Sequence, residues 1–100
     1  MVEIRWTLQA ADDFENIIDY IAHDSNTYAS LFAIDIVSVI ETLKNFPNRG
    51  RIVPEIQKED IREILFGNYR IIYRSRPSVA EVLTIYHGSR LLSPIELGLD

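Results

Sequence analysis

Residues 60–90 read DIREILFGNYRIIYRSRPSVAEVLTIYHGSR, and this stretch decides the fold. Three runs within it, residues 61–66, 69–75 and 79–86, are rich in Ile, Val, Tyr and Phe, which favours β-strands. Gly67 and Asn68 separate the first two runs and form a two-residue hairpin signal. Pro77 lies between the second and third runs, where its ring presets the φ angle of a turn residue. The stretch therefore predicts three consecutive antiparallel strands.

Five arginines and a histidine lie on this predicted meander, namely Arg62, Arg70, Arg74, Arg76, Arg90 and His87. Strand alternation places the arginines at positions 70, 74 and 76 on one face of the second strand. Surface ion pairs with nearby glutamates are the ordinary interpretation, because exposed pairs are common and contribute little. Three guanidinium groups on one face exceed what such pairing needs, so we expect Arg70 or Arg74 to be functional. Arg62, next to Glu63, fits a structural role better.

The first half of the chain predicts a short strand and two helices. Residues 2–6 alternate between apolar and charged side chains, and the Thr7 hydroxyl is placed to cap the helix that follows. Residues 8–23 and 27–45 carry apolar residues at the three-and-four spacing of amphipathic helices. His23 lies where the first helix ends and can meet its carbonyl dipole, and Pro47 ends the second helix. The short connection predicts an antiparallel helical hairpin.

Two sets of side chains on these elements have clear expected environments. The aromatic residues expected in the core are Trp6, Phe14, Phe32 and Phe46. The acidic residues expected on a solvated helix face are Asp12, Asp13, Glu15 and Asp19. Gly50 is expected to permit a turn rather than to cradle a ligand.

These elements together predict one α+β domain that covers residues 1–100. An N-terminal strand, an antiparallel helical hairpin and a three-stranded antiparallel meander form one sheet, with both helices on one face. The strand at residues 2–6 joins that sheet, because an isolated strand has nowhere else to satisfy its backbone. Residues 47–55 form a proline-bounded loop, and residues 91–99 form a short apolar tail. We expect the second face of the sheet to be at least partly open.

Composition excludes several classes of function. The chain has no cysteine, and its two histidines lie far apart, so neither a disulfide framework nor a metal site is expected, and no cofactor motif is present. The N-terminus lacks a signal peptide and no apolar run could span a membrane, which favours the cytoplasm. The net charge is -5, but residues 49–90 carry eight basic and five acidic side chains. We therefore expect a cationic surface on an acidic scaffold.

A series of short motifs follows in order along almost the whole chain. They are the strand ending in Trp6, Ile21-Ala22, Leu43-Lys44-Asn45-Phe46-Pro47, Gly50-Arg51-Ile52-Val53-Pro54-Glu55, Ile61-Arg62-Glu63, Tyr69-Arg70-Ile71-Ile72-Tyr73 and His87-Gly88-Ser89-Arg90. Together they resemble the RelE/ParE superfamily of bacterial toxins. The resemblance implies a small toxin encoded beside an antitoxin, which neutralises it by wrapping an otherwise disordered segment around it.

The superfamily includes two activities. RelE-like members cleave mRNA in the ribosome, and ParE-like members poison DNA gyrase. A metal-free nuclease needs cations for the phosphorane and a proton carrier, for which the resemblance offers Arg62, Arg70 and Arg74 with Tyr86 or His87. The chain has only two lysines, however, and its tail after Arg90 contains no Tyr, His, Lys or Arg. The motif wording is closer to the ParE-like branch.

The leading hypothesis is therefore a gyrase-binding toxin without chemistry of its own. Its expected partners are a cognate antitoxin and DNA gyrase, with operator DNA contacted only through the antitoxin. The residues expected to bind the target or the antitoxin are Arg70, Arg74, Arg76 and Arg90. The alternative is a RelE-like ribosome-dependent mRNA endonuclease. A third hypothesis is an inactive member that only scaffolds its antitoxin.

Overall fold

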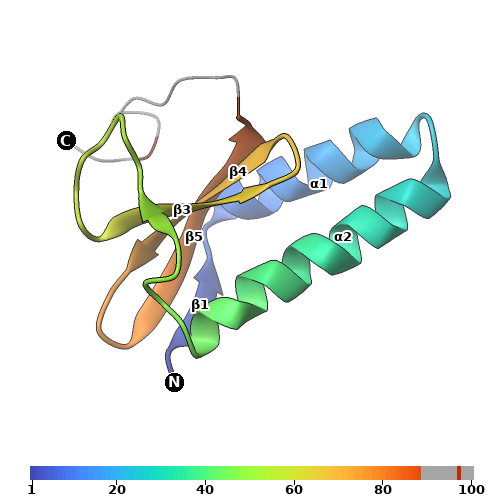
Figure 1. The fold of residues 1–100 in the computed structure, drawn as a ribbon. Helices are drawn as coiled ribbons and strands as arrows, with labels where there is room; N and C mark the ends of the chain where they lie inside the picture. The colour runs from blue at the N-terminus through green and yellow to red at the C-terminus, as the bar shows by residue number, and fades with distance from the viewer. Residues whose placement is uncertain (89–96, 98–100) are drawn as a thin grey trace.

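The computed structural model describes residues 1–88 and residue 97, and they form one five-stranded sheet with two helices on one face (Figure 1). The elements in chain order are β1 (Glu3–Trp6), α1 (Leu8–Ala22), α2 (Asn26–Glu41), a short 3-10 helix η1 (Thr42–Lys44), β2 (Arg51–Ile52), β3 (Ile61–Phe66), β4 (Tyr69–Ser75) and β5 (Val79–His87). The strand order across the sheet is β1-β5-β4-β3-β2. The predicted α+β architecture is confirmed.

The strands β3, β4 and β5 form the predicted antiparallel meander. Gly67 adopts a φ angle of 57°, which closes the two-residue hairpin between β3 and β4. The register between β4 and β5 contains one irregularity, since Ile72 faces Thr84 while the next residue, Tyr73, faces Val82. Leu83 is therefore an extra residue on β5, which is a β-bulge. A bulge reverses the faces of the residues that follow it, and this affects the candidate site.

Two short strands complete the sheet at its edges. β1 joins the sheet, as predicted, and its partner is β5, with which it pairs in parallel. The Val2 amide donates to the Lys44 carbonyl at 2.9 Å. β2 was not predicted, because two residues inside a proline-bounded loop carry no alternation signal. Its pairing partners are Glu63 and Arg62 of β3, so the strand depends on tertiary contact.

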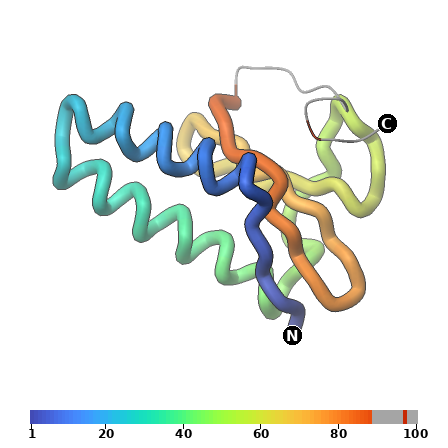
Figure 2. Tube along the Cα trace, turned by 180° about the vertical axis from the view of Figure 1, so that it is seen from behind, coloured from blue at the N-terminus to red at the C-terminus, as the bar shows by residue number. Residues whose placement is uncertain are grey.

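The two helices lie antiparallel beside each other, as the view from behind shows (Figure 2). The Thr7 hydroxyl accepts a hydrogen bond from the Ala10 amide at 3.0 Å, so the predicted cap of α1 is confirmed. His23 occupies the C-cap position of the same helix. α2 ends earlier than predicted, at Glu41, and η1 tightens its last turn before Pro47.

The main core lies between the helices and the sheet. Phe32, Ile36 and Ile40 of α2 pack there with Ile71 and Tyr73 of β4. Ile36, Ile40, Ile71 and Tyr73 are each at most 1% exposed.

The prediction that Phe46 belongs to this core is wrong, because its side chain is 64% exposed. The 3-10 turn of η1 has fewer residues per turn than an α-helix, so it rotates the following residues off the apolar stripe. Leu43, which is fully buried, is the last core residue of this segment.

The second face of the sheet is partly covered rather than bare. Val53, Ile61, Ile72 and Leu83 form a smaller buried cluster on this face. Partly buried side chains from the loop after β2, from β5 and from residue 97 pack against the cluster. The rest of the predicted C-terminal tail lies outside the described residues.

One member of the predicted solvated acidic face has a different role. Asp13 accepts hydrogen bonds from the Thr84 hydroxyl and, at 3.4 Å, from the Ile85 amide. The side chain therefore joins α1 to β5, while Asp12, Glu15 and Asp19 are exposed as expected.

The position of Gly50 predicts a steric effect of mutation. A Cβ at this buried residue would lie 2.7 Å from the Glu63 carbonyl oxygen and 2.8 Å from the Tyr73 ring. We expect Gly50→Ala to lower the free energy of unfolding by about 1 to 3 kcal/mol, as measured by urea denaturation. Gly67→Asn is the control, because Asn tolerates the left-handed conformation and nothing lies within 4 Å of that site. Equal losses from the two variants would contradict the steric explanation.

Burial of Tyr73 predicts a loss of stability at alkaline pH. Burial raises the pKa of the Tyr73 phenol above its ordinary value, although the hydrogen bond from the Gly50 amide opposes this shift. As pH rises, the phenol therefore ionises in the unfolded chain before it ionises in the folded one. The contribution of Tyr73 to the free energy of unfolding is complete below about pH 10 and is lost at higher pH. Above that pH, we expect the free energy of unfolding of the Tyr73→Phe variant to fall less steeply with pH than that of the unmodified chain, as measured by urea denaturation. An unchanged slope would contradict the assignment. Burial also raises the pKa of Tyr69, so part of the slope should remain in the variant.

Candidate functional site

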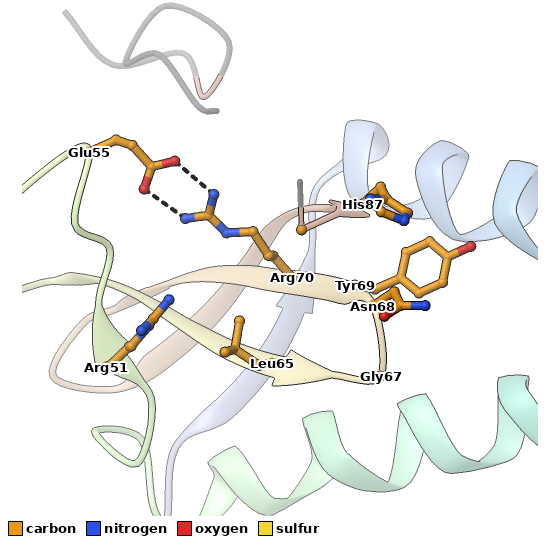
Figure 3. Close-up of a pocket in the computed structure, with 9 residues that line it drawn as sticks. Arg51, Glu55, Leu65, Gly67, Asn68, Tyr69, Arg70 and His87 are labelled. Atoms are coloured by element: carbon orange, nitrogen blue, oxygen red, sulfur yellow. Dashed lines mark hydrogen bonds and ion pairs between the residues drawn. The ribbon is translucent and has the colours of Figure 1, made fainter. Parts of the chain in front are cut away.

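A pocket of about 400 Å³ lies where the β3–β4 hairpin meets the end of β5 (Figure 3). Its walls include Arg51, Glu55, Leu65, Arg70 and His87. The pocket brings together a hairpin turn, a sheet edge and several charged side chains. It also contains two of the residues that the sequence predicted to be functional.

Arg70 is a buried cation that two carboxylates hold in place. Its Nε atom donates to Glu63 Oε1 at 2.6 Å, and its Nη1 and Nη2 atoms donate to the two oxygens of Glu55 at 2.7 and 2.9 Å (Figure 3). Arg70 is only 5% exposed, and Glu63 is 1% exposed. The hydrogen bonds to Glu55 and then Glu63 raise the pKa of Arg70 above its ordinary value, although desolvation opposes this shift. The guanidinium group is therefore fixed and electrostatically compensated.

Arg51 extends this network to the surface. Its Nε atom donates to Glu63 Oε2 at 2.5 Å, so Glu63 bridges two arginines from β2 and β4. The Arg51 side chain is 59% exposed, in contrast to Arg70. Sequence reasoning missed Arg51 as a site residue. The available signal was that Arg51 opens the motif that ends in Glu55. Its positive charge is followed by a negative charge at Glu63 on β3 and a positive charge at Arg70 on β4.

The loop after β2 places Glu55 over β4. The Val53 carbonyl accepts hydrogen bonds from the Ile56 amide at 3.1 Å and the Gln57 amide at 2.9 Å, which closes a tight turn. Gln57 adopts a φ angle of 57° in this turn. Val53 itself is buried against the sheet, so the turn is anchored and its carboxylate is presented to Arg70.

The bulge on β5 separates His87 from Arg70. Tyr69 faces His87 across the β4–β5 pair, and their rings lie 5.8 Å apart. The Tyr69 ring also lies 5.3 Å from Phe32 of α2, so Tyr69 and His87 belong to the helix-covered face. Arg70 faces Tyr86 on the opposite side of the sheet. Arg70 and His87 border the same pocket from opposite faces.

The remaining predicted arginines lie at the other end of β4. Arg74 is four residues along the strand from Arg70, or about 13 Å, and its Nε atom lies 3.8 Å from Asp60 Oδ2. Arg62 donates to the Gly50 carbonyl at 2.9 Å on the helix-covered face and, with Arg76, borders a separate polar pocket. Arg90 lies outside the described residues.

The three arginines that the sequence placed on this face of β4 differ in their surroundings: Arg70 is buried between carboxylates, Arg74 lies near one carboxylate but its buried Nε atom has no hydrogen-bond partner among the described residues, and Arg76 is exposed. Arg70 and Arg74 each have a carboxylate partner, and Arg51 shares Glu63 with Arg70. Two arginines and two glutamates thus lie in one network, in which Arg70 and Glu63 are buried and Arg51 is exposed. Sequence alternation identified the face on which Arg70 lies, but it could not show which carboxylates lie beside it.

Within residues 1–88 and 97, no group of three His, Asp or Glu side chains is arranged to hold a metal ion. Over the same part of the chain, no helix has the length and apolar character required to span a membrane.

The buried ion pairs predict a large effect of mutation. Glu63→Ala leaves Arg70 with one carboxylate in a desolvated position and releases Arg51, so we expect a loss of about 3 to 5 kcal/mol in unfolding free energy. Urea denaturation measures this loss. Glu3→Ala is the control, because Glu3 forms an exposed pair with Arg5 and should cost less than about 1 kcal/mol. A cost for Glu63→Ala as small as that of the control would show that the network is not structural.

The comparisons with known proteins agree with the geometry of the fold. The family model of the ParE toxin of type II toxin–antitoxin systems, parDE, matches residues 4–92. Toxin RelE2 of Caulobacter vibrioides is 28% identical over 91 residues, which cover 91% of this chain and all of that protein. A solved structure of the chromosomal ParDE toxin–antitoxin system from P. aeruginosa has a similar fold, with a TM-score of 0.72 and 23% identity. That match covers 87% of this chain and 96% of the other.

Proposed function

Because the chain belongs to the ParE toxin family of type II toxin–antitoxin systems, we propose that it inhibits DNA gyrase by binding and has no nuclease activity. Family membership alone leaves two activities open, since one relative bears the name RelE2. The choice between them depends on the residues that a nuclease would need.

The observation that carries the proposal is the state of Arg70. A nuclease without a metal must place a cation against the phosphorane as negative charge develops there. Arg70 already makes three hydrogen bonds to Glu55 and Glu63, and those carboxylates would repel a phosphate. Binding RNA here would require Glu55 to leave a buried, bidentate partner, which is costly.

The position of His87 supports the same choice. A general acid or base must lie within hydrogen-bond reach of the group that it serves. The β5 bulge directs His87 to the helix-covered face, away from Arg70, and Arg74 lies further along β4. Arg70 and Tyr86 do face each other across β4 and β5, but Arg70 is held by Glu55 and Glu63. Of the other predicted nuclease residues, His87 and Arg62 lie on the opposite face of the sheet. The three hydrogen bonds of Arg70 in particular support a structural role for this residue.

The second candidate function is ribosome-dependent mRNA cleavage. The 28% identity to Toxin RelE2 over the full length of that protein favours it. Under this hypothesis, Arg62, Arg74 or Tyr86 would have to serve the reaction together with residues outside the described part of the chain. An inactive scaffold for an antitoxin is the third possibility, and failure of expression to slow growth would favour it.

The proposed partners follow from the toxin function. A cognate antitoxin encoded beside the toxin gene neutralises it, gyrase is the target, and both contacts take place in the cytoplasm. Operator DNA is contacted only through the antitoxin. The match to a ParDE toxin–antitoxin structure supports a protein partner for this fold.

A pair of activity assays tests the proposal. We expect the purified chain to inhibit gyrase supercoiling of relaxed plasmid and to leave mRNA intact in a translation extract. The concentration of the His87→Ala variant that inhibits gyrase by half should stay within about twofold of that of the unmodified chain. This is the range expected for a surface change away from the binding contacts. Adding the protein encoded by the adjacent reading frame should restore supercoiling. Cleavage of mRNA in the extract, lost in His87→Ala, together with unaffected gyrase, would overturn the proposal.

A further inference from the structure

The edge of the sheet at β3 is only half covered. β3 has six residues, whereas β2 has two, which face Glu63 and Arg62. No strand of the described residues lies beside the second half of β3 on the β2 side. This half contains Leu65, whose side chain is 55% exposed and borders the hairpin pocket (Figure 3).

The register identifies the backbone groups that face this open edge. Phe66 pairs with Tyr69 to close the hairpin, so the even residues of β3 form their hydrogen bonds with β4. The odd residues face β2, as the hydrogen bond from the Val53 amide to the Ile61 carbonyl shows. The amide and the carbonyl of Leu65 therefore point to the open edge. Unpaired strand groups of this kind are a template for another chain.

The described part of the chain turns away before it reaches this position. The residue that would face Leu65 is two positions before Arg51, but the chain turns away at Gly50. The Gly50 amide donates to the Tyr73 hydroxyl at 2.9 Å, and the Arg49 amide donates to the Phe46 carbonyl at 3.1 Å. Both contacts take residues 46–50 out of line with β2, although the Gly50 carbonyl still accepts a hydrogen bond from Arg62 of β3. No described residue therefore fills the edge beside Leu65.

The side chains at the edge define the chemistry of its occupant. The exposed Leu65 side chain favours an apolar residue directly opposite, as a cross-strand pair. Arg51 lies on the same face of the sheet, and Glu63 fixes its Nε atom while leaving the side chain 59% exposed. The neighbouring carboxylates are largely covered, with Glu63 at 0% and Glu55 at 19% side-chain exposure. A partner therefore meets a positive charge and gains from an acidic residue close to the apolar one.

We propose that the open half of β3 binds an extended segment of the neutralising partner protein as an additional strand, in line with β2. The segment has an apolar residue opposite Leu65 and an acidic residue within two positions of it, next to Arg51. Main-chain hydrogen bonds to Leu65 supply affinity, and the two side-chain contacts supply specificity. This inference rests on the proposed function, because it requires a neutralising protein.

Amide hydrogen exchange measured by NMR tests the added strand. The probe is the purified full-length protein encoded by the adjacent reading frame. We expect the Leu65 amide to exchange at least about tenfold more slowly in the complex, as a newly bonded strand amide does. The Ile4 amide is the control, because it faces the free edge of β1 at the opposite end of the sheet and should not change. Leu65 protection in the free chain at high concentration would indicate self-pairing and overturn the inference.

A matched pair of variants tests the side-chain contact. Leu65→Lys should raise the Kd for the same probe by about tenfold or more, as loss of a central interface anchor does. Ile34→Lys replaces a similarly exposed apolar residue on α2, at 62% against 55% for Leu65, and should keep the Kd within about twofold. Equal losses from both variants would overturn the assignment to β3.

The possible failures can be told apart. If the probe does not bind the unmodified chain and does not restore supercoiling, the proposed partner itself is wrong. If the probe binds and neutralises while Leu65 remains unprotected, only the added strand is wrong. If purified gyrase protects Leu65 and the probe does not, the edge belongs to the target and the assignment to the neutralising partner is overturned.

Discussion

Glu63 is a fully buried carboxylate between two arginines, and the arrangement of the outer sheet face depends on this contact. A buried charge without partners costs several kcal/mol, so both ion pairs must form together as β2 and β3 pair. Arg70 then has one fixed orientation, in which its outer edge meets Glu55 on the loop after β2. The same contact that holds a two-residue strand in place therefore also positions the loop above it.

The network explains how Arg70, in an arginine-rich sheet, adds little free cationic charge to the outer face. The opposite charges of Arg70 and Glu63, which are both buried, cancel. Glu55 covers the outer edge of Arg70. At the hairpin end of this face, Arg51 remains exposed beside an exposed leucine and a stretch of β3 that no described strand pairs, whereas Arg76 is exposed at the far end of β4. Such a surface suits recognition of a polypeptide better than stabilisation of a phosphate. The geometry thus connects the buried ion pairs to the proposed activity as a binding protein.

The sequence predicted the elements whose signals are local. The three-and-four apolar spacing gave both helices, the Thr7 cap was confirmed, and Gly67 marked the hairpin. Features that depend on tertiary contact were not predictable in this way. β2 exists because of β3, and the burial of Arg70 requires Glu55, which lies 15 residues away in the chain.

The candidate site shows the same limit. Alternation correctly placed Arg70 on the face opposite to Tyr73, since β4 has no extra residue. The sequence contained no signal for the bulge at Leu83, and that one residue reverses the faces of Tyr86 and His87. A uniform alternation from Val82 would have put His87 beside Arg70, as a nuclease requires. Phe46 is a comparable case, because the 3-10 turn before it removes it from the apolar stripe.

The most direct test of the central claim is a calorimetric titration of the purified chain into purified gyrase, with intact ribosomes as the parallel titrant. A saturable heat of binding with gyrase and none with ribosomes is the result predicted for a toxin whose Arg70 is structural. Saturable binding to ribosomes, with no heat from gyrase, would contradict it.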